Sequence, residues 1–232
     1  MQQANEIQTN QLGPHPDLEK TVKKHLNSDF KRPIAEHTLQ AFKQALSWLN
    51  DWQGEVYLDA CCGVGESTLQ LAAQYPDIRV IGVDKSAARL QKHGSYVQKQ
   101  TEQSNIQNYK VIQADLNDFW RLLRQTLESS SKQVSWRLTK QFIFYPNPYP
   151  KKSQLGKRWH GSAVFPDILA CCKHVELRSN WRVYVEEFVL AADILGHHAD
   201  IEALTINAEN PPLTPFERKY AQSGQALWTA TT

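Results

Sequence analysis

Short apolar runs alternate with helical patterns through the middle of the chain, and this alternation restricts the fold more than any other feature. Runs of strand length occur at 56–59, 80–84, 109–112, 142–145 and 183–185. Apolar residues at helical spacing lie between them, at 66–74, 85–103, 118–128 and 166–177. Strands and helices in this order indicate an α/β fold with a parallel sheet covered on both faces. Ligands of such folds bind beyond the carboxyl ends of the strands.

The residues before this alternation have a different character. Residues 1–15 are rich in Gln, Asn and Thr, which predicts a flexible tail. Two helices are expected after the tail, from Asp17 to Leu26 and from Pro33 to Trp52, because apolar residues recur there at helical spacing. We therefore divide the chain into a tail with a helical extension, residues 1–54, and a main domain, residues 55–232.

The charge is unevenly distributed along the chain. The 26 basic and 24 acidic residues give a net charge of +2, which excludes a uniformly basic protein. Residues 129–166 nevertheless contain no Asp or Glu, and aromatic residues are interleaved with their positive charges. This pattern is typical of a nucleic-acid contact, although a solvated loop whose aromatic residues are core is the alternative. The positive residues are Lys132, Arg137, Lys140, Lys151, Lys152, Lys157 and Arg158.

Membrane, export and metal sites are not expected. No stretch approaches the roughly 18 consecutive apolar residues that span a bilayer, and the first 20 residues are polar. The four cysteines form two adjacent pairs, Cys61-Cys62 and Cys171-Cys172, which fit neither a disulfide framework nor zinc ligands. We expect a cytoplasmic protein with reduced thiols and no metal.

A glycine loop follows the predicted strand at 56–59. Gly63 and Gly65 stand between that strand and the helix at 66–74, where glycines let the backbone pass close to a ligand. The loop departs from the dinucleotide fingerprint, because Thr68 stands where that pattern has Gly or Ala. Glu66 at the start of the helix would repel a pyrophosphate. The loop therefore favours a ligand without phosphate.

Three acids fall at the carboxyl ends of consecutive predicted strands. Asp59 precedes the glycine loop, Asp84 comes 19 residues after Gly65, and Asp115 ends the strand at 109–112. A carboxylate at the position of Asp84 reaches the hydroxyl pair of a ribose. Together they predict a pocket for an adenosine-containing ligand that is not strongly anionic, and S-adenosylmethionine fits that description. The alternative is that each acid caps a helix.

The chain resembles the class I S-adenosylmethionine-dependent methyltransferases. Asp59-x-Cys61-x-Gly63-x-Gly65 is similar to the acidic glycine motif of that class, with Cys61 in place of the first glycine. The sequence Tyr-Pro-Asn-Pro-Tyr-Pro-Lys-Lys at 145–152 and Thr-Pro-Phe-Glu-Arg at 214–218 are more specific. In this order they resemble the tRNA (guanine-N7)-methyltransferase family, whose motifs read Phe-Pro-Asp-Pro-Trp-Pro-Lys-Lys and Thr-Lys-Phe-Glu-x-Arg.

The resemblance implies a Rossmann-like, doubly wound, mostly parallel sheet and three groups of site residues. The residues that fall at the cofactor are Asp59, Gly63, Gly65, Asp84, Asp115 and Leu116. Those that fall at the target guanine are Asn147, Thr214, Glu217 and Glu187, with Glu186 as the other candidate for the last carboxylate. The expected tRNA contacts are Lys151, Lys152, Lys157, Arg158 and Tyr149.

Three departures from the family affect the residues expected at the reaction. Asn147 replaces the acid that the family places between the two prolines, and Tyr149 replaces its Trp. The family's Thr-Asp after the fifth strand has no clean counterpart at 184–187, where Glu186 or Glu187 would have to supply the carboxylate. Methylation of guanine N7 needs alignment rather than a general base, because N7 carries no proton. We therefore expect a tRNA (guanine-N7)-methyltransferase, monomeric or homodimeric, that uses Glu217 in place of the missing charge. The alternatives are a diverged methyltransferase with another substrate and a non-catalytic RNA-binding protein.

Overall fold

The structure is a computed structural model that describes residues 4–99, 105–129 and 134–232. The chain forms two compact units. One is Arg32–Phe142, and the other combines the residues up to Lys31 with Ile143–Thr232. The N-terminal residues thus fold with the C-terminal part of the chain, so neither unit begins or ends at the expected boundary after residue 54.

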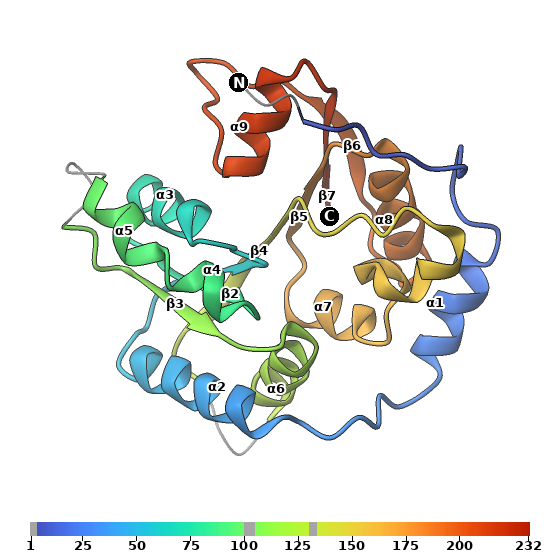
Figure 1. Cartoon of the computed structure of the whole chain (residues 1–232). Helices are drawn as coiled ribbons and strands as arrows, with labels where there is room; N and C mark the ends of the chain where they lie inside the picture. Colours follow the sequence, from blue (N-terminus) through green and yellow to red (C-terminus); the bar gives the residue numbers. More distant parts are fainter. Residues whose placement is uncertain (1–3, 100–104, 130–133) are drawn as a thin grey trace. The chain divides into compact units, whose positions relative to one another are not determined.

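The unit Arg32–Phe142 alternates strands and helices as predicted. Parallel pairing joins β1 to β2 and β2 to β3, with Val56 opposite Arg79 and Val80 opposite Tyr109. Figure 1 shows α3 on one face of these strands and α2 and α6 on the other. The elements are α2 (Glu36–Leu49), β1 (Glu55–Ala60), α3 (Glu66–Gln74), β2 (Arg79–Asp84), α4 (Ala87–Leu90), α5 (His93–Lys99), β3 (Tyr109–Gln113), α6 (Leu116–Glu128) and β4 (Arg137–Phe144), whose last two residues belong to the other unit.

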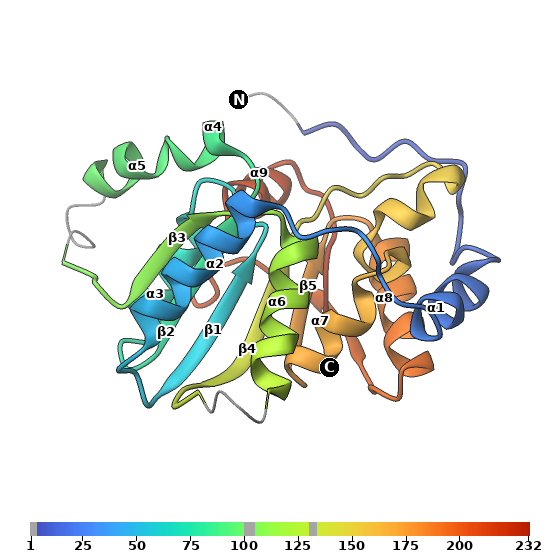
Figure 2. The same ribbon diagram turned by 90° about the horizontal axis from the view of Figure 1, so that it is seen from below.

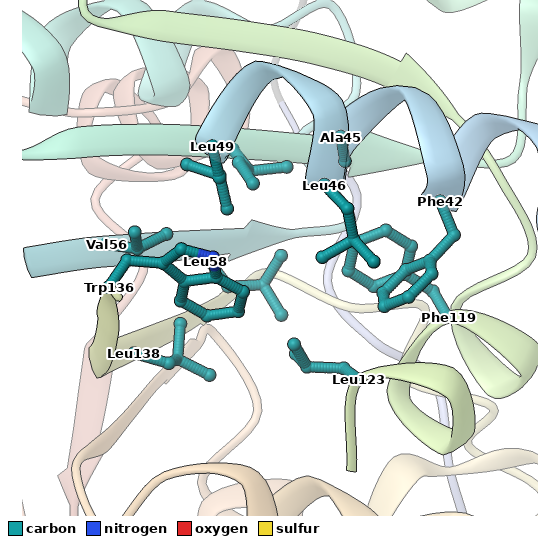
Figure 3. A pocket seen from close by; sticks show the side chains of 11 residues that line it. Phe42, Ala45, Leu46, Leu49, Val56, Leu58, Phe119, Leu123, Trp136 and Leu138 are labelled. Atoms are coloured by element: carbon teal, nitrogen blue, oxygen red, sulfur yellow. The ribbon is translucent and has the colours of Figure 1, made fainter. Parts of the chain in front are cut away.

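Apolar side chains from α2, α6 and the strands form the core of this unit. Phe42 and Phe119 pack edge to face with ring centroids 5.1 Å apart. Figure 3 shows them around a cavity of about 10 Å³, with Leu58 and Trp136 among the other residues that line it. A space this small and apolar is a packing gap of the core. The ligand site of this unit therefore lies elsewhere.

The second unit joins the N-terminal segment to the C-terminal part of the chain. β7 pairs antiparallel with both β5 and β6. Helix α1 packs against α8 (Figures 1 and 2). The elements are α1 (Leu18–Leu26), the 3₁₀ helices η2 (Lys152–Lys157) and η3 (Trp159–Gly161), α7 (Phe165–Cys171), β5 (Val175–Ser179), α8 (Arg182–Ile194), β6 (Asp200–Leu204), α9 (Pro215–Gln222) and β7 (Leu227–Thr231).

Among the described residues, the strand order of the sheet is β3-β2-β1-β4-β5-β7-β6. The predicted α/β class is confirmed. Two predictions are wrong: residues 183–185 lie inside α8, and the helix expected at 166–177 ends at Cys171, so that residues 175–177 lie in β5 (Val175–Ser179). The helix expected at 85–103 consists of α4 and α5, and residues 100–103 lie outside the described part, as does Lys132.

Over the described ranges, no helix is long and apolar enough to cross a membrane. The same ranges contain no group of three or more His, Cys, Asp or Glu residues placed to hold a metal ion. All four cysteines are free thiols. Burial raises the pKa of the Cys62 thiol well above its ordinary value, so this residue packs beside the glycine loop as a neutral side chain.

Candidate active site

The loop between β1 and α3 has left-handed backbone at Cys61, Gly63 and Gly65, with φ of 64°, 62° and 77°. Glycine adopts this conformation without strain. A Cβ atom on Gly63 would meet no atom within 4 Å, so the space beside it is open. A Cβ atom on Gly65 would lie 2.6 Å from Nδ1 of His93. Gly63 therefore leaves room for a ligand near the backbone, whereas Gly65 makes room for His93.

Asp84 ends β2 and holds the glycine loop in place. Its Oδ2 accepts a hydrogen bond of 3.0 Å from the backbone N–H of Gly63, and its Oδ1 accepts one of 2.7 Å from that of Ser86. Arg89 Nη1 lies 3.4 Å from Oδ2. A carboxylate has about four acceptor positions, so Asp84 retains about one, which a hydroxyl group of a ribose can use.

Asp59 lies beneath the same loop and is almost fully buried. Its Oδ2 accepts hydrogen bonds from Ser67 Oγ at 2.7 Å and Thr68 Oγ1 at 2.6 Å, which tie the first turn of α3 to β1. Its Oδ1 has no hydrogen-bond partner. Burial raises the pKa of Asp59 to about 6, and the bonds from Ser67 and Thr68 oppose that rise. Oδ1 is thus a buried acceptor that lacks a donor.

Asp115, the third acid, is the N-cap of α6. Its Oδ1 accepts from the backbone N–H of Asn117 at 2.9 Å, and its Oδ2 pairs with Arg32 at 3.1 Å. Burial alone would raise the pKa of Asp115, but the bonds from Asn117 and the charge of Arg32 outweigh burial and lower it. Leu116 is buried as the first residue of the helix. The capping role considered from the sequence accounts for Asp115.

In the second unit, the segment 145–150 contains two strained residues. Tyr145 and Tyr149 have φ of 48° and 45°, and each precedes a proline. Left-handed backbone at a bulky residue costs about 1–3 kcal/mol, and such strain gathers at functional sites. The N–H of Tyr145 donates to the carbonyl of Arg178 at 2.8 Å, and its ring lies 5.6 Å from that of Tyr220. These contacts hold the strained turn.

Glu217 is fully buried and also holds this turn. Its Oε1 accepts from the hydroxyl of Tyr145 at 3.0 Å and from Arg178 Nη1 at 2.9 Å, while its Oε2 accepts from the N–H of Leu213 at 2.6 Å. Thr214 caps α9 by accepting from the N–H of Glu217 at 3.0 Å. Burial and the charge of Glu217 raise the pKa of Tyr145, so its hydroxyl stays protonated. Glu217 thus acts on the turn through Tyr145.

Glu187 lies in a separate buried cluster. Its Oε2 accepts from Arg158 Nη1 at 2.5 Å and His160 Nε2 at 2.8 Å. Its Oε1 accepts from Gln11 Nε2 at 2.6 Å and the N–H of His15 at 2.8 Å. Burial would raise the pKa of Glu187, but His160 and Arg158 outweigh it and lower the pKa to about 2. Both oxygens are therefore engaged within the protein.

This cluster changes the roles of two residues expected at the substrate. Glu187 and Arg158 are both fully buried, so neither presents its charge to a macromolecule. Glu187 was expected at the guanine and Arg158 at the tRNA, but both hydrogen-bond to neighbouring segments of the protein and hold them in place. The tail expected to be flexible is also anchored here, through Gln11 and His15. No sequence signal marks Gln11, because it stands 176 residues from Glu187.

The other residues expected at the substrate are exposed or half-buried. Asn147, Lys151, Lys152 and Lys157 are exposed, and Glu186 pairs with Arg182 on α8. The Lys157 ammonium lies 5.8 Å from the centre of the half-buried Tyr149 ring. Sequence reasoning missed Arg178, which joins Glu217 to Glu176. The signal was the alternation of Glu176 and Arg178 within an apolar run.

The family model Methyltransf_4, which describes methyltransferases, matches residues 53–230. The chain belongs to this methyltransferase family. Three similar proteins are all tRNA (guanine-N(7)-)-methyltransferases, so the resemblance inferred from the sequence is confirmed. That of Nitrosococcus oceani is 27% identical over 76% of this chain and 70% of its own length. Those of Thiobacillus denitrificans and Methylobacillus flagellatus are 26% and 29% identical, over 72% of this chain and 69% and 66% of their lengths.

Solved methyltransferase structures share the fold. An antibiotic-related methyltransferase superposes with a TM-score of 0.58 and 14% identity, covering 82% of this chain and 93% of its own. The 16S rRNA methyltransferase KamB superposes with a TM-score of 0.55 and 16% identity, covering 86% of this chain and 94% of its own. The expected Rossmann-like methyltransferase fold is therefore confirmed.

This methyltransferase uses S-adenosylmethionine, and its first unit has the groups to hold that ligand. The buried Oδ1 of Asp59 lacks a donor, which an ammonium group supplies. Asp84 has an acceptor position for a ribose hydroxyl, and the open space beside Gly63 admits a ligand close to the backbone. Asp59, Gly63 and Asp84 therefore fit this ligand, whereas Gly65 makes room for His93 and Asp115 caps α6.

Proposed function

We propose that this enzyme methylates N7 of a guanine in tRNA. The observation that carries the proposal is its similarity to tRNA (guanine-N(7)-)-methyltransferases over about three quarters of the chain. The sequence at 145–152 and the Thr214-x-Phe216-Glu217 motif support it, because hydrogen bonds connect the two. The hydroxyl of Tyr145 donates to Glu217, and the backbone N–H of Glu217 donates to Thr214. We place the reaction in the cytoplasm, where a tRNA substrate is available.

The reaction requires mainly that guanine N7 be aligned with the methyl group of the sulfonium. S-adenosylmethionine, which Asp59, Gly63 and Asp84 would hold, would supply the methyl group of its sulfonium. The lone pair of guanine N7 would form the new C–N bond as the C–S bond breaks and S-adenosylhomocysteine departs. No proton leaves N7, so the enzyme needs no general base. The base becomes cationic, and protein groups that favour positive charge there lower the barrier. The enzyme's own task is to hold the guanine in line.

Asn147 is the group we assign to the guanine. It is exposed on the 145–150 turn, and its amide oxygen can accept a hydrogen bond from the guanine amino group. Both oxygens of Glu217 are engaged and its charge is paired with Arg178, so Glu217 does not supply the missing negative charge. Glu217, with Thr214, instead sets the position of Tyr145 and hence of the turn. The loss of a negative charge at Asn147 predicts a slow enzyme.

The test is methyl transfer from labelled S-adenosylmethionine to bulk tRNA that lacks 7-methylguanosine, followed by digestion to nucleosides. The proposal expects label in 7-methylguanosine. Label in a different nucleoside would instead support a diverged methyltransferase with another substrate, which the exchange at Asn147 favours. Cofactor and tRNA binding without any transfer would indicate a non-catalytic RNA-binding protein.

A further inference from the structure

A groove lies between the N-terminal segment and the start of η2. One wall is Gln8, Thr9 and Asn10, and the other is Pro150–Ser153. Its volume is about 640 Å³, within the ~300–1,000 Å³ of ligand pockets. Both walls belong to the same compact unit, and Figure 2 shows the N-terminal segment (dark blue) running beside the 145–155 segment (yellow).

The lining suits an anion. It contains the ammonium groups of Lys151 and Lys152, the amides of Gln8 and Asn10, and no carboxylate. Both lysines and both amide residues are exposed. Lysine and amide N–H groups bind phosphate oxygens, and the absence of an acid removes the usual repulsion. The charges of the lining therefore favour an anion such as phosphate.

A single buried ion pair fixes both walls. Arg158 Nη2 donates to Gln11 Oε1 at 2.9 Å, while Gln11 Nε2 donates to Glu187. The same guanidinium donates to the carbonyl oxygens of Tyr149, at 3.1 Å, and Lys151, at 3.4 Å. Thr9 Oγ1 adds a direct bond of 2.7 Å to the carbonyl of Pro150. The spacing of the walls thus depends on the contacts of Gln11 with the Arg158–Glu187 pair together with the Thr9–Pro150 bond.

We infer that residues 8–10 form the second wall of a subsite for an RNA backbone phosphate, and that Gln11 is a positioning residue that keeps this wall at its distance from Lys151 and Lys152. The family model begins at residue 53, so this wall lies outside the matched region. The inference rests on the proposed function only for the source of the phosphate, a polyribonucleotide.

The test places a negative charge in the groove. Asn10→Asp is compared with Asn5→Asp, the same change at an exposed residue of the same segment that does not line the groove. We expect the tRNA affinity of Asn10→Asp to fall roughly fivefold, more at low salt than at high salt, and that of Asn5→Asp to change less than twofold. S-adenosylmethionine affinity stays constant in both. Equal tRNA affinity of the two variants would overturn the inference, whatever the methyl transfer activity.

A second probe separates this inference from the proposed function. Inorganic pyrophosphate is titrated into the wild type and Asn10→Asp while the amide resonances of residues 8–10 and 151–153 are followed. We expect concerted shifts in the wild type and a severalfold weaker response in Asn10→Asp. If the wild type binds no tRNA, the proposed function fails, and this titration alone decides the subsite. The absence of shifts in the wild type would then overturn it.

Gln11→Ala tests the positioning role. We expect a severalfold higher KM for tRNA with an unchanged kcat, and faster proteolysis within residues 4–15, because the wall is released while the reacting groups stay in place. A fall in kcat at constant KM would contradict positioning. Gln11→Glu keeps the acceptor for Arg158 but places a second carboxylate beside Glu187, so it should not restore the KM.

Discussion

Arg158 Nη1 lies 2.5 Å from Glu187 Oε2, and both side chains are fully buried. The pair shares its environment with His160, whose pKa burial lowers, so the imidazole donates to Glu187 as a neutral ring. Further bonds from the guanidinium reach backbone carbonyls of the 149–151 segment. Arg158 therefore holds the backbone of residues 149–151 from inside the protein. The neighbouring Lys151, Lys152 and Lys157 are exposed.

Removing this guanidinium will destabilise the protein. Arg158→Met leaves the Glu187 carboxylate buried without its cation, which costs about 3–5 kcal/mol of unfolding free energy. Lys157→Met, one residue away and exposed, is the matched control and should change stability by less than about 0.5 kcal/mol. Urea unfolding measures both. Equal effects of the two changes would show that the ion pair contributes nothing.

Asp59 makes stability fall as the pH rises. Burial raises its pKa from 3.8 to about 6, so the folded state holds this proton more tightly than the unfolded state. The resulting contribution to the free energy of unfolding is complete below pH 3.8 and is lost as the pH rises past 6. Asp59→Asn removes that loss, and we expect it to exceed the wild type in stability by up to about 3 kcal/mol at pH 8, with no gain at pH 4. Unfolding is measured at both pH values. The exposed Asp77→Asn is the control, and a gain for Asp59→Asn that is independent of pH would refute this account.

Gly63 is expected to matter more for the cofactor than for the fold. Gly63→Ala and Gly196→Ala both place a Cβ at positive φ with no atom within 4 Å, so each should cost about 1 kcal/mol of stability. Only the first methyl group occupies the open space that we assign to the ligand. Calorimetry should show S-adenosylmethionine affinity at least about tenfold lower in Gly63→Ala and unchanged in Gly196→Ala. If both variants bind normally, the assignment of the loop fails.

Restoring the missing acid should speed the reaction. Asn147→Asp places a negative charge where positive charge develops on the guanine, an effect of order tenfold in kcat. Because Asn147 is exposed, stability should stay within about 0.5 kcal/mol. Single-turnover rates with tRNA measure the change, with Asn5→Asp as a control for the added charge. A slower enzyme would show that the amide is itself adapted to the substrate.

Local patterns predicted the first unit well and the second less well. The glycine loop between β1 and α3 follows from Gly63 and Gly65 and their flanking apolar runs. β5 escaped prediction because Glu176 and Arg178 interrupt its apolar run, and their ion pair makes their burial tolerable. The triplet 183–185 suggested a strand, but α8 buries it on a helical face together with Phe188.

The site was predicted in composition but not in contacts. The Tyr145–Glu217 and Arg158–Glu187 bonds join residues 72 and 29 positions apart. Only the folded chain brings such partners together, so a sequence pattern marks the residues without their roles. Glu217 and Arg158 were accordingly assigned to the substrate, and the structure places both in supporting networks. Asn147, which the sequence marked by its departure from the family, is exposed.

The most direct test is to map N7 methylation on the tRNA itself. Guanines methylated at N7 lose aromaticity on borohydride reduction, and aniline then cleaves the chain at those positions. After incubation of undermethylated tRNA with this enzyme and S-adenosylmethionine, the account predicts cleavage at a discrete guanine that is absent without the cofactor. Incorporation of methyl groups without any such cleavage, or no incorporation by a protein that binds both ligands, would contradict it.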